Sequence, residues 1–174
     1  MSVMQGKALK YGDNINTDLI SPPQYLEKSL DIIAKHAMEG IDEHFCTKLA
    51  AGDILVAGSN FGPGSSRETA PIALKLVGVG AIVAKSFARI FYRNAINIGL
   101  PVVECQQTDK ISDGDILEIS LSAGTITNKT NGEIYQVSPL SEPVMDVLSA
   151  GGLIPFLEQK YGKDIMGITQ LPPG

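Results

Sequence analysis

Four polar residues stand together at the end of a glycine-rich stretch: Ser65-Ser66-Arg67-Glu68 follow Gly58-Ser59-Asn60-Phe61-Gly62-Pro63-Gly64. A serine hydroxyl can act as a nucleophile when a neighbouring group takes its proton. The guanidinium of Arg67 can hold a carboxylate through two parallel hydrogen bonds. Glycines allow the backbone itself to approach a ligand closely. The stretch is therefore a candidate site for a substrate that carries a carboxylate.

The same spacing also has a purely structural interpretation. Ser65 and Glu68 fit the capping box S-x-x-E, in which both side chains bind free backbone N–H groups at the start of a helix. Pro71 bears on both interpretations, because a proline beyond the first turn distorts a helix. We therefore expect a distortion there, or a helix that begins near Pro71. The loop lacks the Gly-Lys-Ser/Thr of a P-loop and the G-x-S-x-G of a nucleophile elbow, which disfavours a nucleotide site and a serine hydrolase.

Strands and helices alternate around this stretch. A short strand at residues 7–11 and helices at 29–38 and 43–49 precede it. The pattern then predicts buried strands at 53–58, 81–84 and 101–104, with helices from the loop to Val77 and at 87–98. Such alternation is typical of a parallel sheet. The loop thus joins the carboxyl end of a strand to the start of a helix, which is where α/β sheets bind ligands and where anions are favoured.

The last third of the chain has a different character. Residues 116–121 alternate apolar and polar side chains, as in a strand with one face in solvent. Asn131-Gly132 lies between the extended segments 125–128 and 133–137 and predicts a hairpin turn. Two short helices, 143–149 and 155–161, follow. The sequence therefore predicts an α/β fold, a mixed sheet with flanking helices and an antiparallel β appendage, in one domain over residues 1–174.

Composition excludes several classes of partner. The formal net charge is −5 over 174 residues, without a basic cluster, so we expect no nucleic-acid partner. No stretch approaches the ~20 apolar residues of a membrane span. Because the N-terminus also lacks the apolar core of a signal peptide, a cytoplasmic protein is expected. Cys46 and Cys105 are isolated in sequence, so they should be reduced thiols that are too few to hold a four-iron cluster alone.

Several segments together resemble the swivel domain of aconitases. They are Asn60-Phe61-Gly62-Pro63-Gly64-Ser65-Ser66-Arg67-Glu68, Ala84-Lys85-Ser86-Phe87-Ala88-Arg89-Ile90-Phe91 with Asn94, Asn97-Ile98-Gly99-Leu100-Pro101, Asn16-Thr17-Asp18 and Tyr25-Leu26. The chain looks closest to the separate small subunits of isopropylmalate isomerases. The resemblance spans roughly the first hundred residues; beyond Thr108 only length and general pattern agree.

The resemblance implies a division of labour between two subunits. A large subunit would carry a [4Fe–4S] cluster, and this chain would hold no cofactor but close over the site in a heterodimer or heterotetramer. By motif match, Ser65 would be the catalytic base, acting as an alkoxide. Ser66 and Arg67 would bind a carboxylate of a small dicarboxylate substrate, and Asp18 would lie at the edge of the active site.

The loop after Tyr25-Leu26 bears on the choice of substrate. In this family the loop faces the variable group of the substrate, which adds Lys28 to the residues expected to bind it. Homoaconitase-type subunits place an arginine where this chain has Glu27, so a third substrate carboxylate is disfavoured. The resemblance therefore implies isomerisation of 2-isopropylmalate to 3-isopropylmalate, a step of leucine biosynthesis. The alternatives are a methylmalate or dimethylmalate (citramalate-type) dehydratase subunit, and a non-catalytic anion-binding module.

Overall fold

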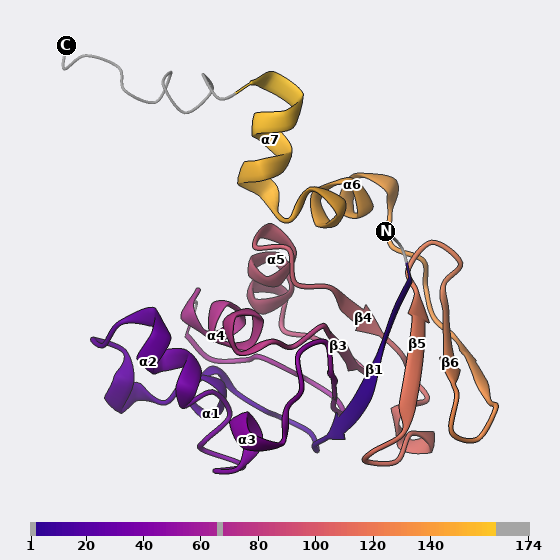
Figure 1. The fold of residues 1–174 in the computed structure, drawn as a ribbon, viewed down its shortest axis with the longest axis horizontal. Helices are drawn as coiled ribbons and strands as arrows, with labels where there is room; N and C mark the ends of the chain where they lie inside the picture. The colour runs from indigo at the N-terminus through magenta and orange to yellow at the C-terminus, as the bar shows by residue number, and fades with distance from the viewer. Residues whose placement is uncertain (1–2, 66–67, 163–174) are drawn as a thin grey trace.

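The computed structural model describes residues 3–65 and 68–162. Within these residues seven strands form one mixed sheet in the order β4-β3-β2-β1-β5-β6-β7 (Figure 1). The strands are β1 (Val3–Lys10), β2 (Ile54–Val56), β3 (Ala81–Ala84), β4 (Val102–Glu104), β5 (Ile116–Ser120), β6 (Thr125–Asn128) and β7 (Ile134–Gln136). The helical segments are α1 (Thr17–Ile20), η1 (Pro23–Tyr25), α2 (Leu30–Lys35), α3 (Phe45–Lys48), α4 (Thr69–Val77), α5 (Arg89–Asn97), η2 (Thr108–Lys110), α6 (Glu142–Ala150) and α7 (Leu153–Tyr161).

Strands β1 to β4 form the parallel half of the sheet. Every residue of β2 and β3 is buried, as expected for parallel strands that are covered on both faces. Helix α4 connects β2 to β3, and α5 connects β3 to β4. The alternation of strands and helices in the sequence therefore predicted this half of the fold correctly.

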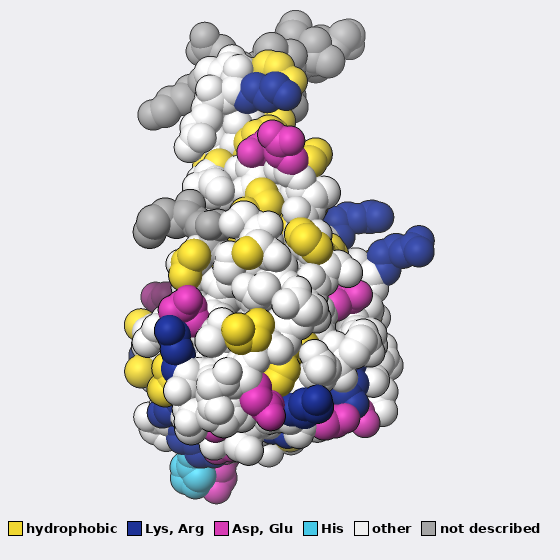
Figure 2. Space-filling view, turned by 90° about the vertical axis from the view of Figure 1, so that its right-hand side faces the viewer, with side chains coloured by type: hydrophobic (Ala, Val, Ile, Leu, Met, Phe, Trp, Pro, Cys, Tyr) yellow, Lys and Arg dark blue, Asp and Glu magenta, His cyan; other side chains and the backbone are white. Residues whose placement is uncertain are grey.

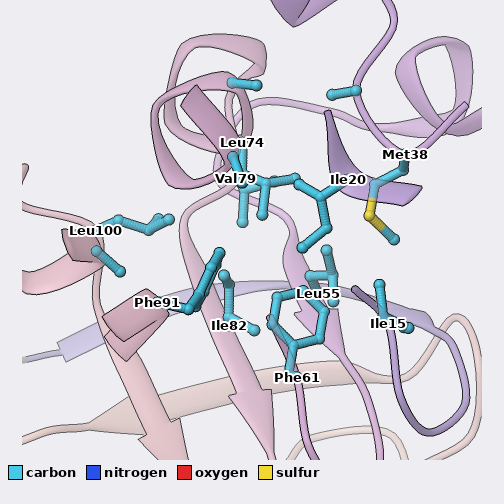
Figure 3. Packing of buried hydrophobic residues seen from close by; sticks show 14 of the residues in the cluster. Ile15, Ile20, Met38, Leu55, Phe61, Leu74, Val79, Ile82, Phe91 and Leu100 are labelled. Carbon is cyan, nitrogen blue, oxygen red and sulfur yellow. The ribbon is translucent and has the colours of Figure 1, made fainter. Parts of the chain in front are cut away.

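Alternate residues of the parallel strands enter two separate cores. Leu55 and Ile82 pack with residues of α1, α4 and α5, and Figure 3 shows them beneath Ile20 and Leu74 of these helices. Their neighbours in the strands, such as Ile54, face the other way and pack with inward-facing residues of β5 to β7. The antiparallel strands therefore cover the face of the parallel half that the helices leave open.

The antiparallel half begins at β5, which pairs with the side of β1 opposite β2. β6 then pairs with β5, and β7 pairs with β6. The turn between β6 and β7 contains Gly132, which has φ 79° and donates its N–H to the carbonyl of Asn128 at 2.7 Å. The predicted appendage is thus confirmed, and it is continuous with the parallel strands.

Helices α6 and α7 add an outer layer and contain no fully buried residue. Lys75 of α4 binds them to the body, because its ammonium group donates to the carbonyl of Ile98 after α5 and to that of Gly151 after α6. Ile154 and Tyr161 of α7 remain 54% and 59% exposed. Figure 2 shows hydrophobic side chains open to solvent in this upper part of the molecule. No helix in the described ranges combines the length and apolar character of a membrane span.

Some element boundaries differ from the prediction. β1 starts at Val3 instead of residue 7, because Val3–Lys7 pair with β5, which is remote in sequence. The helix predicted at 29–38 ends at Lys35, since the chain then turns and Met38 takes a left-handed conformation (φ 63°) with its side chain fully buried. β3 and β6 have the predicted bounds.

Candidate active site

Backbone hydrogen bonds join the residues before Ser65 to loops on both sides. After β2, the chain passes between the loop that follows β1 and the loop that follows β3. On one side the N–H of Gly62 donates to the carbonyl of Ile15 at 2.8 Å. On the other side the N–H of Phe61 donates to the carbonyl of Ser86 at 3.0 Å, and Phe61 bridges to Phe87. The backbone that leads to Ser65 is therefore fixed by the fold itself.

Three polar side chains connect the loop after β1 to the loop after β2. Asn14 and Asn60 both take the left-handed conformation, with φ 56° and 58°, which asparagine adopts more readily than most residues. The Asn60 side-chain amide donates to Asn14 Oδ1 at 3.1 Å. Asp13 Oδ1 accepts the N–H of Ser59 at 2.7 Å. These polar side chains thus hold the loops after β1 and β2 together.

Phe61 anchors the loop in the core below it. Its side chain is 1% exposed and meets the rings of Phe87 and Phe91 edge-on, at 5.9 and 5.2 Å between centroids. Figure 3 places Phe61 beside Leu55 of β2. Gly62 follows with φ 88°, and a β-carbon at Gly62 would collide with the ring of Phe91. A glycine is therefore required directly after the anchor.

Ser65 lies at the surface, in a bend ahead of α4. α4 begins at Thr69, and Glu68, the residue before it, makes no side-chain capping hydrogen bond. Because the helix starts four residues after Ser65, the capping-box interpretation of Ser65 and Glu68 is wrong. The expected start near Pro71 is confirmed: Pro71 is the third helical residue, where a missing N–H costs no helical bond.

The loop after β1 brings Asp18 to the same place. Asn16 caps α1 by accepting the N–H of Leu19, and the N–H of Thr17 donates to the carbonyl of Pro63 at 2.9 Å. Asp18 follows in the first turn of α1, with an exposed side chain. The Asn16-Thr17-Asp18 segment thus adjoins the loop of Ser65, and the expected place of Asp18 at the edge of an active site stays a prediction. Both Asp18 and Ser65 are open to solvent on this surface.

Lys28 lies in the turn between η1 and α2 and is exposed. Its N–H donates to the carbonyl of Tyr25 at 2.9 Å. The ring of Tyr25 stacks on His36 with centroids 3.7 Å apart, and His36 also binds Glu39. These contacts join η1 to the end of α2. In the described part of the chain, no hydrogen bond or ion pair joins Lys28 to residues 58–65.

Ser66 and Arg67 lie outside the described residues. Their expected part in binding a substrate carboxylate therefore stays a prediction. They follow Ser65 directly in the chain and precede α4, so any site built on Ser65 has both of them as neighbours in sequence.

Residues 7–108 match the family model of the aconitase C-terminal domain. A 3-isopropylmalate dehydratase small subunit from Caldicellulosiruptor bescii is 52% identical over 164 residues, which is 93% of this chain and 99% of that relative. The chain belongs to the family of 3-isopropylmalate dehydratase small subunits. Another small subunit of this family, from Nautilia profundicola, is 51% identical over 160 residues, covering 91% of this chain and 96% of its own.

A solved structure shows that the similarity to this family extends to the fold. The crystal structure of 3-isopropylmalate dehydratase (leuD) from Methanocaldococcus jannaschii has a TM-score of 0.88 and 44% sequence identity, covering 96% of this chain and 99% of its own. These findings confirm the fold class and the family recognised from the sequence. The aconitase match ends after β4, so the parallel half that carries the candidate site is the part shared with aconitases.

The cysteines of this small subunit are packed as structural thiols. Burial raises the pKa of both Cys46 and Cys105, which disfavours the thiolate that a metal ligand needs. The Cys46 thiol also lies 3.4 Å from the carbonyl of Ala34. In the ranges 3–65 and 68–162, no group of three His, Cys, Asp or Glu residues is placed to hold a metal ion. These residues therefore do not fit an iron–sulfur cluster.

Thr17 lies at the candidate site, although the sequence did not single it out by its own chemistry. Its side chain is 2% exposed, yet its hydroxyl has no hydrogen-bond partner within the described structure. The hydroxyl faces Gly64, where a β-carbon would lie 2.7 Å from Thr17 Oγ1. The one signal in the sequence was its place between Asn16 and Asp18 in the segment that resembles aconitases.

Proposed function

We propose that this chain is the small subunit of a hydro-lyase that interconverts 2-isopropylmalate and 3-isopropylmalate in leucine biosynthesis. The support is the identity of about half the residues to small subunits of this name over nearly the whole chain. The single structural observation that carries the proposal is the hydrogen bond from Thr17 to Pro63, which sets Asp18 beside the loop of Ser65. In this proposal the enzyme works in the cytoplasm with a large subunit.

Ser65 acts as the general base. The reaction removes a proton from the carbon beside a carboxylate, expels the hydroxyl group from the neighbouring carbon as water, and then adds water back with the two positions exchanged. Ser65, as an alkoxide, takes the proton in the first half and returns it in the second. A serine is a weak base in water, so this role needs positive potential in a site from which water is excluded.

The other residues of the site bind and orient the dicarboxylate. Arg67 holds one carboxylate through its two parallel N–H groups, and Ser66 donates a further hydrogen bond to it. The charge of Arg67 and the amino end of α4 also favour the alkoxide form of Ser65. Asp18 and Lys28 contribute from the edge, on α1 and on the turn before α2.

The large subunit completes the site. Ser65 and Asp18 both face solvent, so a partner must cover them before water can be excluded. Because the described residues of this chain do not fit a metal centre, we assign the [4Fe–4S] cluster expected from the aconitase resemblance to the large subunit. Its chemistry there would be that of a Lewis acid toward the substrate hydroxyl. This chain supplies the base and the carboxylate contacts.

The Glu27-Lys28 turn is exposed, and the family resemblance implies that it faces the variable group of the substrate. Substrate preference therefore tests its role. A panel of substituted malates, offered to the reconstituted enzyme, discriminates the branched substrate from methylmalate and dimethylmalate. We expect the highest kcat/KM with isopropylmalate. Turnover of none of these malates by an intact complex would favour the anion-binding module.

The test of the base is Ser65→Ala in the reconstituted two-subunit enzyme. We expect kcat to fall by at least ~10²–10⁴-fold, the usual contribution of a positioned base. Exchange of the substrate's C–H proton with solvent deuterium should fall equally, because this assay reports proton removal without product release. Ser59→Ala is the matched control, since Ser59 is exposed in the same loop and its side chain makes no hydrogen bond with a described residue.

Docking and folding must be measured beside the kinetics. The Ser65→Ala chain should bind the large subunit and melt within ~2 °C of the parent, because Ser65 caps no helix. If it docks normally and exchange continues within a few-fold of the parent rate, another residue is the base.

A further inference from the structure

A buried hydroxyl without a partner is uncommon in a folded protein. Most buried polar side-chain atoms have at least one hydrogen bond, and leaving one unmade is destabilising. Thr17 Oγ1 is the one buried side-chain oxygen or nitrogen of the described residues that has none. The neighbouring polar groups of its segment are engaged: Asn16 caps α1, and the Thr17 N–H binds Pro63. Because this unmade hydrogen bond lowers the stability of the fold, we expect the hydroxyl to have a function.

The position of Thr17 suggests what the hydroxyl serves. Thr17 Oγ1 lies against the Cα of Gly64, so closely that a β-carbon there would be 2.7 Å away. Ser65 is the next residue, and consecutive Cα atoms are only ~3.8 Å apart. A small rotation of the Gly64–Ser65 segment would therefore bring a polar group of Ser65 within reach of the hydroxyl. Gly64 has φ 121°, which favours glycine, and a glycine places no side chain between Thr17 and Ser65.

We propose that Thr17 is a positioning residue for Ser65: in the closed enzyme its hydroxyl donates a hydrogen bond to the Ser65 oxygen. The inference rests on the proposed role of Ser65 as base. A donated hydrogen bond favours the alkoxide over the alcohol and fixes its direction. Catalytic hydrogen bonds are often unmade in the free protein and form in the complex with substrate. Thr17 is buried under the loop and does not contact the substrate.

The decisive variant is Thr17→Val, which keeps the shape of the side chain and removes the hydroxyl. In the isolated chain an unmade hydrogen bond is replaced by an apolar group, so the melting temperature should stay the same or rise. In the reconstituted enzyme kcat for isopropylmalate should fall by ~10-fold or more, as for a lost hydrogen bond to a charged group. KM should stay within ~2-fold, because the hydroxyl does not touch the substrate.

Two further readouts separate positioning from packing. The low-pH limb of the deuterium-exchange rate should move to higher pH in Thr17→Val, because the alkoxide loses a donor and the pKa of Ser65 rises. Thr17→Ser keeps the hydroxyl and should restore kcat to within ~3-fold of the parent. The double variant Thr17→Val/Ser65→Ala should be no slower than Ser65→Ala alone, since Thr17 acts through Ser65.

Each outcome has one meaning. Thr17→Val with kcat within 2-fold of the parent, while Ser65→Ala is inactive, overturns the inference and leaves the proposed base intact. A Thr17→Val chain that melts lower, and a Thr17→Ser chain that is equally slow, would mean that the methyl packing of Thr17 matters and its hydroxyl does not. Sustained exchange in a docked Ser65→Ala enzyme overturns the proposed base itself, and the inference with it.

Discussion

Gly64 separates Ser65 from the fixed part of its loop, and its backbone leaves no room for a side chain. It has φ 121°, and an added β-carbon would approach Thr17 Oγ1 to 2.7 Å. We therefore expect Gly64→Ala to lower the free energy of unfolding by about 1–3 kcal/mol. The turnover of the reconstituted enzyme should fall as well, because Ser65 is displaced. Urea unfolding of the isolated chain and kcat of the complex measure the two effects.

Gly12 provides the matched control for this substitution. It lies two residues after β1, its φ is not in the left-handed region, and an added β-carbon would meet nothing within 4 Å. Gly12→Ala should change the unfolding free energy by less than about 0.5 kcal/mol. Equal losses in both variants would show that the close approach of Gly64 to Thr17 is unimportant.

At the residue scale the sequence predicted a candidate site and its chemistry, which the structure does not test, and it indicated only part of the geometry. Ser65 and Arg67 stand out by residue type and by their place after a strand, and Asp18 by its segment. The buried contact of Thr17 with Gly64 could not be read from the sequence, because it depends on how the loops after β1 and β2 meet. The capping box was misleading, since local spacing cannot show that the helix begins only at Thr69.

A polar cluster joins the residue after β1, the segment between α2 and α3, and the end of α3. Tyr11 donates its hydroxyl to Asp42 at 2.6 Å, and Lys48 at the end of α3 binds the same carboxylate at 2.6 Å. The hydrogen bonds from Lys48 and Tyr11 lower the pKa of Asp42 to about 2. Burial, with the bond to Asp42, raises the pKa of Tyr11 above its usual range, so it stays a donor. The cluster holds α3 against the loop that leads to Thr17.

The cluster makes stability depend on pH in the acid range. The folded pKa of Asp42 lies below the unfolded value of ~3.9, so its contribution is complete above about pH 4 and is lost as the pH falls toward 2. We expect the parent to exceed Asp42→Asn by about 1–2 kcal/mol near pH 7, a figure reduced for solvent screening at the half-exposed Lys48. Urea unfolding from pH 7 to pH 3 measures the difference.

Tyr11→Phe serves as the control for this prediction. It removes one of the two donors, so the folded pKa of Asp42 should rise part of the way, and the loss of stability in acid should be smaller and end at a higher pH. A parent and an Asp42→Asn variant whose stabilities stay a constant distance apart from pH 7 to pH 3 would contradict the account.

Elements defined by local pattern were predicted well, and those defined by remote partners were not. The bounds of β3 match because four apolar residues lie between turn residues, and the hairpin follows from Asn131-Gly132. The first residues of β1 were missed, because Val3 becomes a strand residue only by pairing with Ser120. α2 ends early because the burial of Met38 in the core outweighs helix propensity over residues 36–38.

On the scale of the whole molecule, the proposed function gives this chain half of a site. Ser65 and Asp18 are exposed, and the described residues offer no metal centre. We expect the purified chain to bind no stoichiometric iron, to be colourless, and to have no dehydratase activity until the large subunit is added. Iron analysis, visible absorption and turnover of isopropylmalate measure these properties. Turnover by the chain alone would contradict the division of labour.

The central place of β1 in the sheet has a consequence for how the protein is made. β1 leaves the ribosome before the other six described strands, yet its antiparallel partner β5 begins only at Ile116. While the segments between them are synthesised, one edge of β1 has unpaired N–H and C=O groups and could join another chain. The apolar face around Ile54 is also uncovered until β5 to β7 arrive. Nascent chains of this protein should therefore depend on chaperones until synthesis has passed the hairpin.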